Sequence, residues 1–256
     1  MNGSKVPKLA DIIEPTQFVE VYGKLSAGDY VGKLVPSLGM LIEHELFNPQ
    51  VLVSDEFLDT NTFLSITYFN SISEPLKLVN EGLKVIREAP IALSLTQEMG
   101  FGKTHFLTLL WHLYAQTYRW RIDQLEKFNI ELRKLNYDRN VAERTLVFAI
   151  DLSKYPLELK PYEAMFEISA RILERKSEFH GIKILDPKFL KNLSKLRPVE
   201  AAKTLISNLI NLKESIPILV IVDELYDGVR STIGGGAYER IESLKDLILF
   251  LKELLE

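Results

Sequence analysis

The sequence contains no cysteine, which excludes a disulfide-stapled scaffold, a thiolate zinc site and a cysteine nucleophile. It also lacks long hydrophobic runs. The densest apolar stretches, 218–222 and 247–251, are far shorter than the ~20 residues that a membrane-spanning helix needs. The first residues lack the apolar core of a secretory signal. We therefore expect a cytoplasmic protein with no membrane partner.

A surplus of positive charge is missing as well. The formal net charge is −4, which argues against a generally basic nucleic-acid binder, although a local basic patch remains open. The 256 residues, 46% of them hydrophobic and 26% charged, have the composition of an ordinary globular chain of one or two domains. Intrinsic disorder and collagen-like structure are thereby excluded.

Three short apolar runs are typical of buried strands, at residues 91–96, 145–151 and 218–223. Amphipathic or apolar stretches with helical spacing separate them. Buried strands that alternate with helices predict an α/β fold with a mainly parallel sheet flanked by helices. The residues before the first strand predict a mostly helical or irregular N-terminal region.

The helices are expected at definite places. Ser73 and Pro75 form a good helix start, and Pro90 favours an end near Arg87. Residues 119–144 carry one apolar stripe and predict a single amphipathic helix inserted against the sheet, with a coiled-coil hairpin as the alternative. The other expected helices are 103–118, 161–176, one or two within 187–213 (the second opened by Pro198), and 238–256.

The sharpest motif follows the first predicted strand and opens an apolar helix. It matches the phosphate-binding P-loop, G-x-x-x-x-G-K-[ST], except that glutamine replaces the first glycine. Glycines let backbone N–H groups surround phosphate oxygens, the lysine reaches the β- and γ-phosphates, and the threonine hydroxyl ligates Mg²⁺. The expected nucleotide-binding residues are Gln97, Glu98, Met99, Gly100, Phe101, Gly102, Lys103, Thr104 and His105.

A second motif ends the third predicted strand, where Asp223 and Glu224 follow the apolar run 218–222. Downstream of a P-loop this pattern predicts a Walker B element. Asp223 and Thr104 are the expected Mg²⁺ ligands, because ligands of α/β sheets gather at the strand tips. Glu224 is the expected general base that polarises the attacking water, and Lys103 the catalytic cation. The alternative is a strand followed by an acidic, solvated turn.

These motifs resemble a family of archaeal and bacterial AAA+-like P-loop ATPases known as a domain of unknown function. The likeness covers most of residues 25–256 and is carried by 93–107 with 110–113, by 63–69 and by 221–225. It implies an ATP-binding and ATP-hydrolysing domain with Mg²⁺ as cofactor. It further implies work on DNA or a DNA-bound complex, in a homo-oligomer or with a partner chain. The alternative is an ATP-sensing, non-hydrolysing module of a DNA-modification or defence complex.

The sequence pattern predicts two parts: a helical or irregular N-terminal region, 1–87, packed on the core, and a P-loop ATPase core, 88–256, with a helical insertion at about 119–144. In AAA+-type ATPases a sensor strand and an arginine finger follow the Walker B helix, whereas this sequence ends at Glu256. We therefore expect a truncated chain, a split gene or a variant sheet.

Weaker signals have simpler explanations. His105 and His112 lie seven residues apart on one predicted helix, and a metal pair is disfavoured because no third ligand accompanies them. Arg230 lies in a glycine-rich loop, for which flexibility is the simpler interpretation than contact with DNA or a neighbouring subunit.

Overall fold

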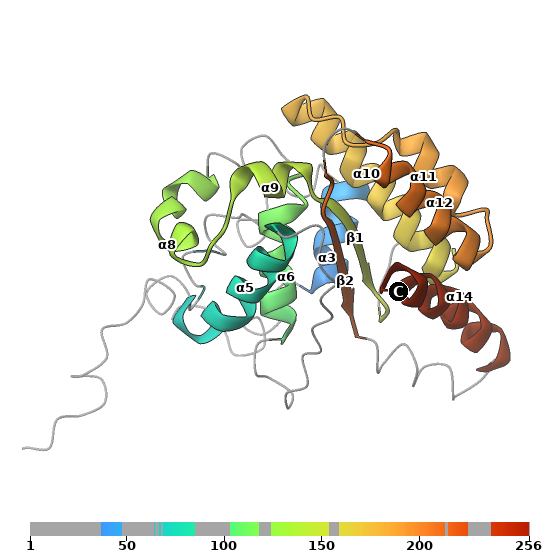
Figure 1. Cartoon of the computed structure of the whole chain (residues 1–256). Helices are drawn as coiled ribbons and strands as arrows, with labels where there is room; N and C mark the ends of the chain where they lie inside the picture. The colour runs from blue at the N-terminus through green and yellow to red at the C-terminus, as the bar shows by residue number, and fades with distance from the viewer. Residues whose placement is uncertain are drawn as a thin grey trace, which may run out of the picture.

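Two parallel strands form the centre of the molecule, with helices packed on both sides (Figure 1). The computed structural model describes residues 37–47, 64, 67, 69–84, 103–117, 124–153, 159–212, 215–224 and 237–255. Strand β1 spans Leu146–Asp151 and strand β2 spans Ile218–Asp223. Their register pairs Leu146 with Ile218 at one end and Asp151 with Asp223 at the other. The two strands therefore begin together and end together.

Alternate side chains of the two strands serve two separate hydrophobic cores. Successive side chains of a strand point to opposite faces. Val147, Ala149, Leu219 and Ile221 lie in one core, while the residues between them lie in the other. Because helices cover both faces of β1, all six of its side chains are buried. This three-layer arrangement confirms the coarse α/β prediction.

The first core is covered mainly by helices that precede β1 in the sequence, and Ile168 and Ile172 from a helix that follows β1 also belong to it. Trp111 and Tyr114 are among its largest fully buried side chains. The Trp111 Nε1–H donates to Glu45 Oε2 at 2.8 Å, and the Thr117 hydroxyl donates to the same oxygen, so this buried carboxylate is hydrogen-bonded. The elements of this layer are α3 (Leu38–Ile42), the π-helical turn η2 (Glu43–Phe47), α5 (Phe69–Lys84), α6 (Lys103–Tyr114), α8 (Asn129–Lys134) and α9 (Arg139–Arg144).

The second core is covered by helices that follow β1. Phe250 of α14 lies at its centre, with the rings of Phe148, Tyr162 and Phe166 at centroid distances of 5.8, 5.7 and 4.9 Å. The elements of this layer are α10 (Pro161–His180), α11 (Pro187–Leu193), α12 (Pro198–Ile210) and α14 (Ala237–Leu255). Proline occupies the first helical turn in α10, α11 and α12. Backbone N–H groups in the first turn have no intrahelical acceptor, so a proline there removes no hydrogen bond of the helix.

Most element predictions from 145 onward are confirmed. The second and third predicted strands are β1 and β2, and Pro198 opens the second of two helices within 187–213. The final predicted helix is α14. The first predicted strand, 91–96, lies outside the described residues. No helix in the described part of the chain is long and apolar enough to cross a membrane.

The prediction of one helix across 119–144 is wrong. Helices α8 and α9 are separate, because Asn136 adopts a left-handed backbone with φ of 61°. Asp138 then caps α9 by accepting the Asn140 N–H at 2.9 Å. The apolar stripe nevertheless lies where it was predicted, since Leu125, Leu132 and Leu135 are buried.

Three predicted helix boundaries, one start and two C-terminal ends, are also wrong. Helix α5 begins at Phe69 and contains Pro75, because Ile72 and Leu76 both pack on the first core and so extend the helix before the proline. Helix α6 ends at Tyr114, just before Gln116 with its left-handed φ of 48°. Helix α10 continues beyond 176 to His180 and stops at Gly181, whose φ of 68° suits a left-handed cap.

A buried lysine joins the two layers near the start of β1. Lys176 of α10 has no exposed surface, and its Nζ donates to the carbonyl oxygens of Ala142 at 3.1 Å, Thr145 at 2.9 Å and Glu143 at 3.4 Å. Two of these carbonyls belong to the last turn of α9, which gains a cation at its C-terminus. Burial lowers the pKa of Lys176 to about 7.

Candidate functional site

Polar side chains from three elements meet at the ends of the two strands. Asp151 closes β1, and Asp223 closes β2 in register with it. Lys103 and Thr104 form the start of α6, and both act on the Asp223 carboxyl group. The fold thus brings the end of the predicted P-loop to the predicted Walker B aspartate, as the sequence motifs require.

The Asp223 carboxylate is buried but only partly hydrogen-bonded. Its exposed fraction is 7%. Oδ1 accepts the Glu224 N–H at 2.9 Å, whereas Oδ2 is buried without a hydrogen-bond partner in the described structure. A buried carboxylate oxygen without a donor costs free energy of folding. Oδ2 is therefore the atom of this carboxylate whose capacity to accept a hydrogen bond is unmet among the described residues.

Neighbouring groups shift the pKa of Asp223 in opposite directions. Burial raises the pKa of Asp223 above its ordinary value, and the charge of Asp151 raises that pKa further. The Glu224 N–H lowers the same pKa, as do the Thr104 hydroxyl and the Lys103 ammonium. The Thr104 hydroxyl lies close enough to stabilise the carboxylate, yet it does not complete a standard hydrogen bond to Oδ2.

Glu224 follows directly in a left-handed backbone conformation, with φ of 54°. A side chain with a Cβ adopts this conformation at a cost of roughly 1 kcal/mol or more. The Glu224 N–H donates to Asp223 Oδ1, and the Glu224 side chain is exposed at the strand tip. Such strain in a non-glycine residue is common at functional sites.

Asp151 is the site residue that the sequence motifs missed. It is fully buried, and its Oδ1 accepts from the Ser153 N–H at 2.9 Å and the Ser153 hydroxyl at 2.7 Å. Its Oδ2 accepts the Gly39 N–H of α3 at 3.0 Å. The signal for it was present, because Asp151 ends an apolar strand just as Asp223 does.

His105 contacts Thr67 of the N-terminal region. Its Nε2 is 3.0 Å from the Thr67 hydroxyl, and burial lowers the pKa of His105 to about 4, so the ring is neutral at pH 7. His112 is buried farther along α6.

The described residues include no group of three or more His, Asp or Glu side chains arranged to hold a metal ion. Residues 97–102 of the predicted P-loop lie outside the described residues, and so does Arg230.

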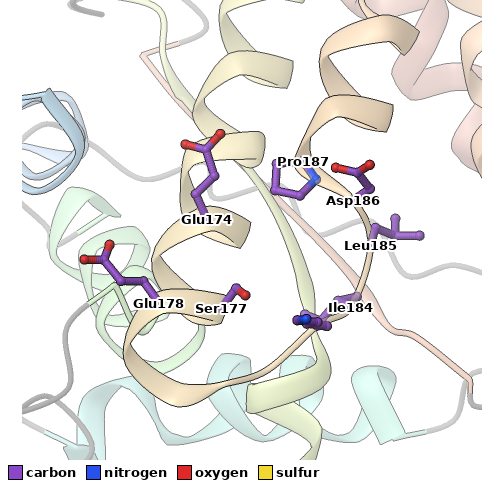
Figure 2. Close-up of a pocket in the computed structure, with 8 residues that line it drawn as sticks. Glu174, Ser177, Glu178, Ile184, Leu185, Asp186 and Pro187 are labelled. Atoms are coloured by element: carbon purple, nitrogen blue, oxygen red, sulfur yellow. The ribbon is translucent and has the colours of Figure 1, made fainter.

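A cavity of about 620 Å³ lies away from this site (Figure 2). It is bounded by the end of α10 and the segment 183–187. Helix α10 ends near the start of β1, since Lys176 contacts Thr145, so the cavity belongs to the opposite edge of the sheet. Its carboxylates have structural partners: Glu174 binds Lys191, Glu178 binds Arg175, and Asp186 caps α11.

No protein-family model matches this sequence, and neither a curated protein nor a solved structure gives a match. What the chain does must therefore be inferred from the residues that meet at the strand tips.

Proposed function

We propose that this chain is a P-loop NTPase domain that binds and hydrolyses ATP with Mg²⁺. The observation that supports this most is the meeting of Lys103 and Thr104 with Asp223, whose buried Oδ2 has no hydrogen-bond partner among the described residues. Residues of these types at a helix start and a strand tip form the two halves of a nucleotide-phosphate site.

Lys103 and the start of α6 would bind the triphosphate. The first turn of a helix presents N–H groups without intrahelical acceptors and the positive end of the helix dipole, and α6 is 12 residues long. The Lys103 ammonium adds a full charge for the β- and γ-phosphates. In the sequence motif the backbone of 97–102 completes the cradle.

The oxygen atoms at this place suit a magnesium ion. Mg²⁺ is a hard cation that prefers carboxylate and hydroxyl oxygens together with phosphates and water. Asp223 and Thr104 supply one carboxylate and one hydroxyl group, and the uncompensated Oδ2 of Asp223 is the atom that would gain a ligand. Bound there, Mg²⁺ would offset charge on the phosphate oxygens during transfer.

Glu224 would serve as the general base for hydrolysis. Its exposed carboxylate follows Asp223 at the strand tip, where a water molecule beside the γ-phosphate would lie. The water oxygen attacks the γ-phosphorus while the bond to the bridging oxygen breaks. The water proton passes to the Glu224 carboxylate, and ADP and phosphate leave.

The work that hydrolysis drives is proposed from the family resemblance alone. On that basis the domain would remodel or move DNA or a DNA-bound complex, as a homo-oligomer or with a partner chain. The second candidate is a nucleotide sensor that binds ATP without turnover. The exposed, strained Glu224 favours hydrolysis over sensing, because a sensor has no need of a base at that point.

Binding is tested by calorimetry with ATP in the presence and absence of Mg²⁺. Lys103→Ala should weaken Mg²⁺-ATP binding about 100-fold, because it removes the side-chain cation of the phosphate site. Lys188→Ala is the matched control, since Lys188 also lies in the first turn of a helix but on α11. Equal loss in both variants, or no binding by the unaltered protein, would refute the phosphate site.

Turnover is tested by phosphate release at saturating Mg²⁺-ATP. Glu224→Gln should retain nucleotide binding and lose at least about 100-fold in rate, because it removes the base and keeps the shape. The hydrolase proposal fails and the sensor proposal holds if the unaltered protein, Glu224→Gln and Lys103→Ala all release phosphate at the same negligible rate while the unaltered protein still binds ATP.

A further inference from the structure

The second carboxylate at the strand tips has no role in the P-loop motif. Asp151 lies beside Asp223 in the strand register, and the backbone on either side is tied because the Leu152 N–H donates to the Asp223 carbonyl at 3.0 Å. Neighbouring strands of a sheet lie about 4.8 Å apart. Two carboxylates on adjacent strands at this spacing share one electrostatic environment.

Hydrogen bonds fix the position of the Asp151 carboxyl group. Three hydrogen bonds from Gly39 and Ser153 stabilise its charge, and they hold both of its oxygens. Those donors come from a helix far away in the sequence and from the residue two positions on. Asp223 differs, since its Oδ2 has no hydrogen-bond partner within the described ranges. One carboxylate is therefore held in place, while the other is left available.

We propose that Asp151 is a positioning residue of the cation site. Its fixed negative charge makes the site around Asp223 favour nucleotide bound together with a divalent cation over metal-free nucleotide. This inference rests on the proposed nucleotide site. A negative charge beside the site attracts the metal ion and repels the metal-free triphosphate. Asp151 acts through the local field and through Asp223, and it is not itself proposed as a ligand.

The charge of Asp151 has two opposite consequences that a structural role would not produce. Asp151→Asn should weaken the affinity of Mn²⁺ for the protein–nucleotide complex about 10- to 100-fold, the range for residues that act through a metal ligand. The same variant should bind metal-free nucleotide at least as tightly as the unaltered protein, because a repulsive charge is gone. A variant that merely loosened the fold would weaken both.

The probes are Mn²⁺ and AMP-PNP, a nucleotide that is not hydrolysed. Electron paramagnetic resonance measures free Mn²⁺ and so gives its Kd for the protein saturated with AMP-PNP. Calorimetry in EDTA gives the Kd of metal-free AMP-PNP. Asp186→Asn is the matched control, since Asp186 also accepts a backbone N–H at a helix start but lies on α11, at the other edge of the sheet. It should change neither Kd.

A second variant covers the case in which Asp151→Asn does not fold, since asparagine cannot accept all three hydrogen bonds. Ser153 is exposed, and Ser153→Lys sets a positive charge beside the Asp151 carboxylate. It should change both affinities in the directions given for Asp151→Asn. Ser153→Ala is its control, because it removes the hydroxyl donor without adding charge.

Each result decides between outcomes. Weaker Mn²⁺ binding with unchanged or tighter AMP-PNP binding supports the inference. A parallel loss of both affinities, or no change in either for both Asp151→Asn and Ser153→Lys, overturns it while the proposed nucleotide site stands. Absence of AMP-PNP binding by the unaltered protein overturns the nucleotide site as well.

Discussion

Replacing Lys176 by methionine should remove a pH dependence of stability that this one residue creates. Lys176 is fully buried against three carbonyl oxygens, and burial lowers its pKa from 10.5 to about 7. The nearby Glu143 opposes this shift without cancelling it. Methionine has a similar length and no charge, so it fills the space and cannot titrate.

The sign and size follow from the two pKa values. Between pH 7 and 10.5 the unfolded chain keeps the Lys176 proton while the folded chain has released it, so the free energy of unfolding increases with pH. Below pH 7 both states are protonated and this gain is absent. For pKa values of about 7 and 10.5, the increase from pH 7 to pH 9 is about 2 kcal/mol.

Urea denaturation at pH 7, 8 and 9 measures this slope. The sequence has no cysteine, so no thiol titrates in the window. Lys191→Met is the control, because Lys191 is partly exposed and paired with Glu174 and Glu167. The unaltered protein and the control should gain stability with pH, while Lys176→Met should not. A flat profile for the unaltered protein, or the same slope in Lys176→Met, would refute the assignment of a lowered pKa to this lysine.

Three further substitutions test other parts of the structure. Asp223→Asn should stabilise the ligand-free protein by about 1 kcal/mol, because it removes a buried carboxylate whose Oδ2 has no hydrogen-bond partner among the described residues. The same variant should abolish stabilisation by Mg²⁺-nucleotide, and a lower melting temperature without ligand would contradict this reasoning. Phe250→Ala should destabilise the fold by about 3–5 kcal/mol in urea titrations, because a fully buried ring is lost from contact with three other aromatic rings; a loss below about 1 kcal/mol would mean that α14 is not held by this core. Gly181→Ala should cost only about 1 kcal/mol by the same measurement, from its left-handed backbone, since an added Cβ meets no atom within 4 Å.

Local signals predicted the second half of the chain well. Proline and aspartate at helix starts and β-branched apolar runs in strands are short-range features, and β1, β2, α11 and α12 follow them closely. The pairing of Lys103 and Thr104 with Asp223 was also predictable, because the motif implies the arrangement. In each case the residues that define the element are neighbours in sequence.

Most of the predictions that failed depended on contacts between distant residues, and one depended on a local backbone conformation. Helix α5 begins before Pro75 because its first turns pack on a core that sequence spacing does not display. The break at Asn136 needed knowledge of a single backbone angle. The sequence shows that Asp151 ends an apolar strand, but its place beside Asp223 depends on the strand register, and its fixed position depends on the Gly39 N–H of α3.

The Gly39–Asp151 hydrogen bond also bears on how this protein can be divided. The segment 37–47 lies in the N-terminal region, 1–87, that was expected to pack on the core. Its residues Leu38, Leu41 and Ile42 are fully buried in the same core as Trp111. A fragment that began at residue 88 would leave the Asp151 carboxylate without its Gly39 donor and would open the apolar surface under α3 to water. Any minimal version of the candidate site must therefore include α3 with its N-cap Ser37, because this helix is distant from β1 in the sequence but contacts Asp151 at the end of β1.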